Sequence, residues 1–324
     1  MSDAEAVLLM AYGTPATLDQ VGAYFTHIRG GRTPSPEAVA HLRERYVRIG
    51  GTTPLLQITE GLAARLGDYL RAEGAPRSIY IGMKHWHPYI ADAMRVMRDD
   101  GVRKVTAIVL APHYSLLSVG AYRHEVEKVQ RELGNPFTLR FVERWHAIPE
   151  FLDMMANLVR DGLARFPAEV RGNVLVVFTA HSLPVRIREW ADPYEDELRE
   201  SSRAVAERVG LPDWRFAWQS AGGSGEPWIG PDILEYLDTL HGEGVRQVLQ
   251  VPIGFLSEHL EILYDIDIEA KGKAASLGIT LHRTELPNAS AALVRTLAAV
   301  VESEGEGDGS GSLTTTTAST NKRQ

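Results

Sequence analysis

The chain has 324 residues, 44% of them apolar, and a formal net charge of −8. The negative charge argues against a nucleic-acid partner, because neutralising phosphates requires a basic surface, and no apolar run approaches the roughly 18–20 residues of a transmembrane helix. Because the chain has no cysteine, disulfides, thiolate zinc sites and cysteine-bound iron–sulfur clusters are excluded, and any metal must be met by nitrogen and oxygen. The acidic start MSDAEA is unlike a secretory signal, so we expect a soluble cytoplasmic protein.

Six short apolar runs alternate with stretches of helical periodicity such as PEAVAHLRERYVRI. This β-α-β-α pattern predicts an α/β fold with mainly parallel sheets covered by helices on both faces. The runs are AVLLMAY (6–12), SIYIGM (78–83), VTAIVLAP (105–112), NVLVVFTA (173–180), RFAWQS (215–220) and VLQVPIGF (248–255).

The runs fall into two sets of three, which predicts two similar Rossmann-like lobes, residues 1–150 and residues 151–302. Two lobes also suit the length, since single cores stop growing at about 250–300 residues. Residues 303–324 are rich in Gly, Ser and Thr and are predicted to be a disordered tail. Ligands of open α/β sheets bind beyond the carboxyl ends of the strands, so we expect the loops after the strands to line an active-site cleft between the lobes.

In the first lobe, Tyr12 follows the first strand, where a tyrosine either packs against the fold or faces a cleft. Arg29 and Arg32 flank a glycine pair in THIRGGR, and Arg45 precedes YVRIGG. Each arginine alone is typical of a surface, but together they can grip carboxylates in bidentate fashion. The glycine pairs do not form G-x-G-x-x-G after a strand, so a dinucleotide site is not expected.

In the second lobe, His181 directly follows an all-apolar strand in VLVVFTAHSLP. A lone histidine is commonly structural, but its place at the carboxyl end of a strand favours a site residue, and imidazole exchanges protons near neutral pH. Ser182 lacks the G-x-S-x-G context of a serine hydrolase.

The segment GFLSEHLEILYDIDIEA (254–270) leaves the last strand and is predicted to be helical. Glu258, Glu261, Asp265 and Glu269 are spaced by three, four and four residues, which places them in one narrow arc of a straight helix. Like charges at these spacings destabilise a helix. The acidic stripe is therefore either a solvated face or a group that holds a metal or titrates abnormally.

Taken together, these motifs resemble the ferrochelatases, which insert Fe(II) into a porphyrin. The resemblance covers almost all of residues 5–300 and implies that the acidic helix carries catalytic and metal-handling groups and contains a π-helical distortion, a feature of many functional sites. Its motifs are LLMAYGTP, YFTHIRGGRTPSPE, RYVRIGGTTPL, YIGMKHWHP, LAPHYSLLSVGAY, TAHSLP, WQSAGG with PWIGPD, and VPIGFLSEHLEILYDIDIEA.

MAYGTP and THIR are similar to the branch from Gram-positive and related bacteria, which metallates coproporphyrin III rather than protoporphyrin IX. The resemblance implies substrate contacts from Tyr12, Arg29, Arg45, Thr53 and Tyr122. A glycine replaces the second arginine that often follows Arg29, and Thr53 stands where serine is usual, so one propionate contact is expected either to be weaker or to come from Arg32. Some relatives carry an iron–sulfur cluster on cysteines, which this chain cannot.

The resemblance implies that His181 accepts pyrrole protons with Glu261 as its acidic partner, and that Asp265 and Glu269 provide a path for metal entry or proton exit. His181, Glu261, Asp265 and Glu269 are the predicted metal contacts, and a His–Glu pair can serve as base or as metal ligands. The sequence does not decide which face of the porphyrin ring receives the iron.

Fe(II) is expected as a substrate, with no tightly bound cofactor. Expected partners are coproporphyrin III, Fe(II) and, transiently, the downstream coproheme decarboxylase, with the chain acting as a monomer. The alternatives are a protoporphyrin IX ferrochelatase, a non-catalytic carrier of tetrapyrrole or metal, and a chelatase for cobalt or nickel.

Overall fold

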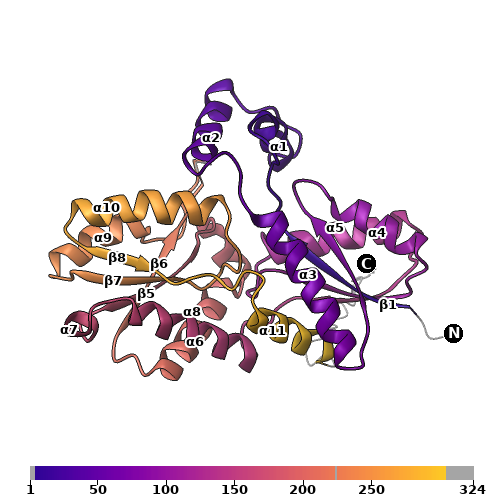
Figure 1. Cartoon of the computed structure of the whole chain (residues 1–324). Coiled ribbons are helices and arrows are strands. Elements are labelled where there is room, and N and C mark those ends of the chain that lie inside the picture. Colours follow the sequence, from indigo (N-terminus) through magenta and orange to yellow (C-terminus); the bar gives the residue numbers. More distant parts are fainter. Residues whose placement is uncertain (1–3, 223–224, 304–324) are drawn as a thin grey trace, which may run out of the picture.

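The computed structural model describes residues 4–222 and 225–303, and within them the chain forms two lobes, each built on a four-stranded parallel sheet (Figure 1). The strand orders, β2-β1-β3-β4 and β6-β5-β7-β8, are equivalent. The prediction of two similar α/β lobes is therefore confirmed. The strands are β1 (Glu5–Ala11), β2 (Ser78–Met83), β3 (Lys104–Val109), β4 (Thr138–Val142), β5 (Leu175–His181), β6 (Trp214–Gln219), β7 (Gln247–Pro252) and β8 (Thr280–Arg283).

Each sheet has one strand more than the sequence predicts. The additional strands, β4 and β8, have the sequences TLRFV and TLHR and lie at the edges of their sheets. Each pairs with one neighbour, β4 with β3 and β8 with β7. Both are short and are interrupted by charged or polar residues, so they lack the continuous apolar run that marks a buried strand.

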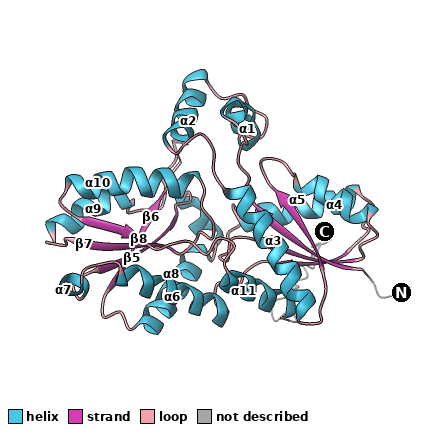
Figure 2. Cartoon of the chain, viewed as in Figure 1, coloured by secondary structure: helices cyan, strands magenta, loops and turns pink. Residues whose placement is uncertain are grey.

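Helices flank both sheets, as Figure 2 shows. No helix in residues 4–222 and 225–303 is long and apolar enough to cross a membrane. The flanking helices are α3 (Leu55–Ala72), α4 (Ile90–Asp99), α5 (Val119–Glu132), α6 (Pro149–Ala164), α7 (Ala168–Arg171), α8 (Tyr194–Val209), α9 (Ile233–Gly242) and α10 (Lys271–Ser276), with short 3-10 turns at η1 (Leu18–Gln20) and η2 (Val185–Trp190).

A helical hairpin of α1 (Val21–Ile28) and α2 (Pro36–Arg48) follows β1 and projects from the body of the molecule (Figure 1). The hydroxyl of Ser35 accepts a hydrogen bond from the backbone of Ala38 at 3.2 Å, which caps the start of α2. The hairpin belongs to the first lobe by sequence but packs on the second. This contact joins Val21, Tyr24 and Tyr46 to Leu260 and Tyr264.

The segment after β7 is a π-helix, η3 (Glu261–Ala270), which continues directly into α10. Ten residues of π-helix is long, since most π-helical segments are single-turn bulges and many of those mark functional sites. The π-helical distortion implied by the family resemblance is confirmed. Figure 1 shows the helix labelled α10 running beneath the α1–α2 hairpin.

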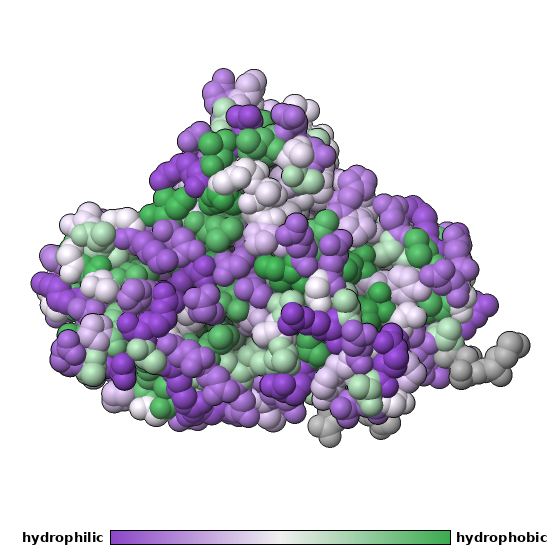
Figure 3. All heavy atoms as spheres, in the orientation of Figure 1, coloured by the Kyte–Doolittle hydropathy of each residue, from purple (hydrophilic) through white to green (hydrophobic). Residues whose placement is uncertain are grey.

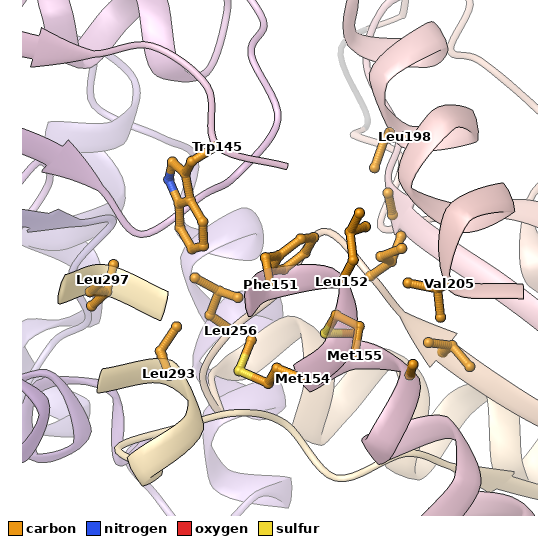
Figure 4. Packing of buried hydrophobic residues seen from close by; sticks show 14 of the residues in the cluster. Trp145, Phe151, Leu152, Met154, Met155, Leu198, Val205, Leu256, Leu293 and Leu297 are labelled. Atoms are coloured by element: carbon orange, nitrogen blue, oxygen red, sulfur yellow. The ribbon is translucent and has the colours of Figure 1, made fainter. Parts of the chain in front are cut away.

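The last helix, α11 (Ala291–Glu302), packs against α3 of the first lobe and against α6. Figure 4 shows Leu293 of α11 beside Met154 of α6, with Leu297 farther along α11. These residues belong to one apolar cluster that also includes residues of α3 and α8. The domain boundary at residue 150 stays a prediction, and the predicted tail beyond Ser303 lies outside the described residues.

Candidate active site

An ion pair joins the end of β5 to the start of η3. The Nε2 atom of His181 lies 3.4 Å from Oε1 of Glu261, and Nε2 of His259 lies 3.5 Å from the other oxygen, Oε2. The side chains of His181 and Glu261 are 30% and 33% exposed. One carboxylate therefore lies between two imidazoles at a position that solvent still reaches.

The surroundings of His181 determine where its protons sit. Its Nδ1 contacts the backbone carbonyl of Ser182. Because a carbonyl only accepts, Nδ1 carries a hydrogen, and Nε2 faces the carboxylate of Glu261. Burial opposes a charged imidazole, but the adjacent Glu261 carboxylate outweighs it and raises the pKa of His181 to about 9.

The same pairing acts on the acid. Burial alone would raise the pKa of Glu261, but the imidazolium of His181 outweighs it and holds that pKa well below the usual range for a glutamate. At neutral pH the pair is an imidazolium and a carboxylate that together hold one proton.

The four acids predicted to form one stripe have different partners. Glu258 lies in the loop before the helix and accepts a hydrogen bond from Nη2 of Arg283 at 3.0 Å. Glu261 pairs with His181, and Glu269 is exposed. The stripe is wrong for Glu258, because the segment becomes helical only at residue 260 and then takes π geometry.

Asp265 is held from two directions. One carboxylate oxygen binds the guanidinium of Arg45 from α2, and the other accepts a hydrogen bond from the hydroxyl of Ser220 at 2.5 Å. Ser220 has φ of +60°, a left-handed conformation that is uncommon for a residue with a side chain. Burial raises the pKa of Asp265 to about 6, although Arg45 opposes this shift.

In the first lobe, the loops after β1 and β2 and the end of α1 bring together a group that we call the first-lobe cluster: Tyr12, His27, Lys84 and His85. The rings of Tyr12 and His85 are 4.5 Å apart, and the Nδ1 atoms of His85 and His27 are 3.2 Å apart. Burial, assisted by Lys84 and His27, lowers the pKa of His85 to about 3. His85 is therefore a neutral imidazole at physiological pH.

Tyr12 contacts His85 in the first-lobe cluster and is also close enough to Glu261 of the second lobe to feel its charge. Its side chain is 44% exposed. Partial burial, together with the negative charge of Glu261, raises the pKa of the Tyr12 hydroxyl, which stays protonated. Burial also lowers the pKa of Lys84 to about 8, so this ammonium group is only weakly held in its charged form.

The four residues predicted to contact propionates differ in accessibility. Arg29 is exposed, with its guanidinium 5.8 Å from the ring centre of Phe25. Arg45 is engaged with Asp265 and also lies 4.7 Å from the ring centre of Tyr264. Of these two arginines, Arg29 is the more accessible to a ligand.

Thr53 and Tyr122 are both buried. The hydroxyl of Thr53 donates to the hydroxyl of Thr14 at 3.1 Å, and the ammonium of Lys84 lies 4.8 Å from the ring centre of Tyr122. A propionate would reach either group only after a local rearrangement. The roles of all four residues stay predictions.

Five side chains at the site escaped prediction: His27, Lys84, His85, Ser220 and His259. His85 had a usable signal, because it follows the second strand as Tyr12 follows the first. His259 had a weaker one, since it lies two residues before Glu261 in a segment already singled out. Ser220 had none, because its contact with Asp265 depends on a left-handed backbone conformation.

No three His, Asp or Glu side chains within residues 4–222 and 225–303 come together in an arrangement able to hold a metal ion. Figure 3 shows apolar residues, in green, on and beneath the projecting hairpin, where it meets the body of the molecule.

Known proteins similar to this chain cover nearly all of it. A family model described as Ferrochelatase matches residues 4–305. A ferrochelatase from Herpetosiphon aurantiacus is 48% identical over 305 residues, which is 94% of this chain and 100% of the relative. The coproporphyrin III ferrochelatase of Bacillus subtilis is 40% identical over 298 residues, which is 91% of this chain and 96% of the relative.

Solved structures of more distant proteins share the fold. The sirohydrochlorin chelatase SirB from Bacillus subtilis subspecies spizizenii, in complex with cobalt, matches with a TM-score of 0.54 at 10% identity, covering 91% of this chain and 92% of that chain. At this identity the likeness shows the two-lobed arrangement alone.

Proposed function

The chain belongs to the ferrochelatase family and inserts Fe(II) into a porphyrin, and we propose that this porphyrin is coproporphyrin III. The Bacillus subtilis relative carries that substrate in its name, whereas the Herpetosiphon relative is named a ferrochelatase without further detail. The choice of porphyrin therefore rests on the residues of this chain that can bind carboxylates.

The observation that carries the proposal is the charge of the α1–α2 hairpin. Residues 17–51 contain five arginines and three acidic side chains, in a chain whose net charge is −8. Coproporphyrin III carries four propionates where protoporphyrin IX carries two. A hydrogen bond to a charged group contributes about 1.5–3 kcal/mol, so one additional contact supports at least a tenfold preference.

We assign propionate binding to Arg29, Arg45, Thr53 and Tyr122. Arg29 is accessible as it stands, whereas Arg45 would have to exchange Asp265 for a propionate or hold both carboxylates at once. Release of Asp265 by the arriving substrate would leave a buried carboxyl with a pKa already near 6. Porphyrin binding would then change the proton affinity of a group on the metal path.

Metal insertion must remove two pyrrole protons, and His181 is the proposed acceptor with Glu261 as its partner. The pair already holds one proton at neutral pH, because the pKa of His181 is raised to about 9. An approaching Fe(II) is a positive charge, which lowers the pKa of a nearby imidazolium. Metal arrival would thus release the resting proton and leave His181 free to accept one pyrrole proton, pass it outward through Glu261, and then accept the second.

The released proton can leave along the acidic side chains of η3. His259 contacts the second oxygen of Glu261 at 3.5 Å, and Asp265 and Glu269 follow along η3 toward the exposed end. We propose that Asp265 and Glu269 carry protons outward, iron inward, or both. Tyr12 and the neutral His85 would lie on the opposite face of the ring and help to hold it bent, which raises the rate only if the bent form fits better than the planar one.

The decisive experiment compares kcat/KM for coproporphyrin III and protoporphyrin IX with Fe(II) under anaerobic conditions, followed by loss of porphyrin fluorescence. We expect a preference of tenfold or more for coproporphyrin III. Arg29→Ala and Arg45→Ala should narrow it, and Arg43→Ala, an exposed arginine on the same helix as Arg45, provides the matched control. Equal or better use of protoporphyrin IX by the wild type would overturn the substrate assignment.

The same assay separates the remaining alternatives. A carrier would bind porphyrin or metal stoichiometrically without turnover. A chelatase for another metal would turn over faster with Co(II) or Ni(II) than with Fe(II) at matched free concentrations. Sustained turnover with Fe(II) excludes the carrier.

A further inference from the structure

The first residue of α8, Tyr194, holds the backbone of His181. Its hydroxyl donates a hydrogen bond to the carbonyl oxygen of His181 at 3.0 Å. The side chain is buried, and its ring centre lies 5.9 Å from that of Trp218. Burial raises the pKa of Tyr194, so the hydroxyl stays protonated and acts as a donor at physiological pH.

This contact bears on the direction in which the imidazole points. The ring of His181 is fixed at Nδ1 by the carbonyl of the next residue, Ser182, so its orientation follows the local backbone. The Nε2–Oε1 distance to Glu261, at 3.4 Å, is already at the long end for a hydrogen bond. A small rotation of the backbone at His181 is therefore enough to break the pair.

The start of α8 is in turn held by the first lobe through Asp192. One carboxylate oxygen of Asp192 accepts from the backbone N–H of Tyr194 at 3.1 Å. The other accepts from the hydroxyl of Ser115 at 3.0 Å and from the backbone N–H of Leu116 at 2.7 Å. The loop after β3 thus reaches across to the residues that precede α8.

Glu197, one turn into α8, adds a parallel contact. Its carboxylate accepts from the backbone N–H of Tyr114 at 2.6 Å, and the side chain is 6% exposed. Three consecutive residues of the first lobe, 114–116, therefore donate to two carboxylates at the start of α8. None of these contacts involves the ion pair or a predicted substrate contact.

We propose that Tyr194 is a positioning residue for His181, and that the 114–116 loop of the first lobe holds it in place through Asp192. The proposal rests on the proposed role of His181 as proton acceptor, and it makes the geometry of that residue dependent on contact between the lobes. Tyr194 does not touch the porphyrin or iron in this scheme.

The test uses Tyr194→Phe, which removes the hydroxyl alone, with Tyr80→Phe as the matched control. Tyr80 also donates a hydrogen bond, to Asp100 at 2.7 Å, but it lies on β2 away from the site. We expect Tyr194→Phe to lower kcat about tenfold, as expected for loss of one buried hydrogen bond, with little change in the KM for porphyrin. Tyr80→Phe should leave both constants unchanged.

A second readout does not depend on turnover. Loosening the pair removes the main influence that raises the pKa of His181, so the imidazole should titrate at lower pH in Tyr194→Phe than in the wild type, as followed by NMR of ring-labelled histidine. Ser115→Ala should move this titration in the same direction by a smaller amount. If the wild type failed to metallate any porphyrin, the proposed function would fall, while the titration would still decide the role of Tyr194.

An unchanged His181 titration in folded Tyr194→Phe would overturn the positioning role, even if the melting temperature fell. A shifted titration in Tyr194→Phe with none in Ser115→Ala would overturn the contribution of the first lobe. If the double variant Tyr194→Phe/Ser115→Ala shifts the His181 titration by the same amount as Tyr194→Phe alone, a single path from the 114–116 loop to His181 is supported.

Discussion

At the strand ends of the second lobe a charged histidine is paired with a carboxylate, whereas at the equivalent ends of the first lobe Tyr12 and His85 are neutral aromatic rings beside Lys84. The second lobe places the His181 imidazolium against the Glu261 carboxylate. The first lobe places Tyr12 against His85, whose low pKa keeps it uncharged. The strand orders of the two sheets are nevertheless equivalent.

The contrast teaches that one topology can supply two kinds of surface, because the strand ends fix only where a side chain emerges. Whether that side chain is charged or neutral depends on its neighbours. A carboxylate at hydrogen-bonding distance outweighs burial at His181, whereas Lys84 and a second imidazole add to burial at His85. A flat substrate between such surfaces would meet an acid–base pair on one face and, on the other, two neutral rings beside the ammonium of Lys84.

The largest effect should come from removing the charged side. We expect His181→Ala to fold normally and to lose metallation by several orders of magnitude, because no other group in its loop has a suitable pKa. Anaerobic turnover of purified protein with a matching circular dichroism spectrum provides the measurement. Near-normal turnover in the folded variant would contradict the role of His181 as an essential base.

A more conservative change tests the charge itself. Glu261→Gln keeps the shape of the side chain but removes the carboxylate that holds His181 charged, so porphyrin should bind almost normally while kcat falls about 100-fold. The pKa of His181 should also fall toward its usual value. A loss confined to porphyrin affinity would instead make Glu261 a binding residue.

The neutral side should tolerate substitution better. His85→Asn replaces a neutral imidazole with a neutral amide and loses the contacts with Tyr12 and His27, so we expect kcat/KM to fall only about tenfold. His87→Asn, in the same loop but exposed, serves as the control. A loss as large as that of His181→Ala would mean that the two lobes contribute equally to the chemistry.

The smallest effect is on stability. The folded pKa of His181, about 9, lies above its ordinary value of 6.5. Its stabilisation is therefore fully present below pH 6.5 and is lost as pH rises through about 9. Allowing for solvent screening, we expect the loss of this charge pairing to lower the free energy of unfolding by about 1–2 kcal/mol between pH 6.5 and pH 9.

Denaturant titrations at pH 6.5 and 9 measure this change. Glu261→Gln should flatten the dependence, because it lowers the pKa of His181 in the folded state. His85 has the opposite shift, so only its unfolded form takes up a proton near pH 6.5, and the protein gains a little stability as pH rises past that value; His85→Asn should remove this small gain but not the decline. A wild-type stability that does not decline between the two pH values would argue against a charged resting pair.

Sequence patterns predicted the strand ends well, since Tyr12 and His181 lie where the apolar runs stop. A buried parallel strand needs apolar residues on both faces, which makes its end visible in the sequence. The short strands β4 and β8 lack such a run and were missed, whereas β2 and β6, which lie at the opposite edges of the same sheets, were found. Periodicity placed the acidic segment correctly but could not reveal where its helix begins.

Partner choice was beyond the sequence. Glu258 and Asp265 have the same charge and were assigned to one stripe, but Arg283 takes the first and Arg45 the second. Arg45 lies 220 positions from Asp265, and Arg283 lies 25 positions from Glu258. Nothing in the sequence near the two acids distinguishes them. The contact of Tyr194 with His181 likewise depends on how α8 meets the end of β5.

The position of α11 affects how the chain is made. This helix, among the last residues described, covers α3, which is synthesised more than 200 residues earlier, and Leu62 and Leu66 of α3 belong to the same apolar cluster as Leu293 and Leu297. Until residues 291–302 have left the ribosome, the apolar side of α3 that α11 covers stays exposed to solvent. Nascent chains with exposed apolar surface are prone to aggregate. A stalled or prematurely terminated product that ends before residue 291 should therefore bind chaperones or precipitate, even though its first sheet is complete.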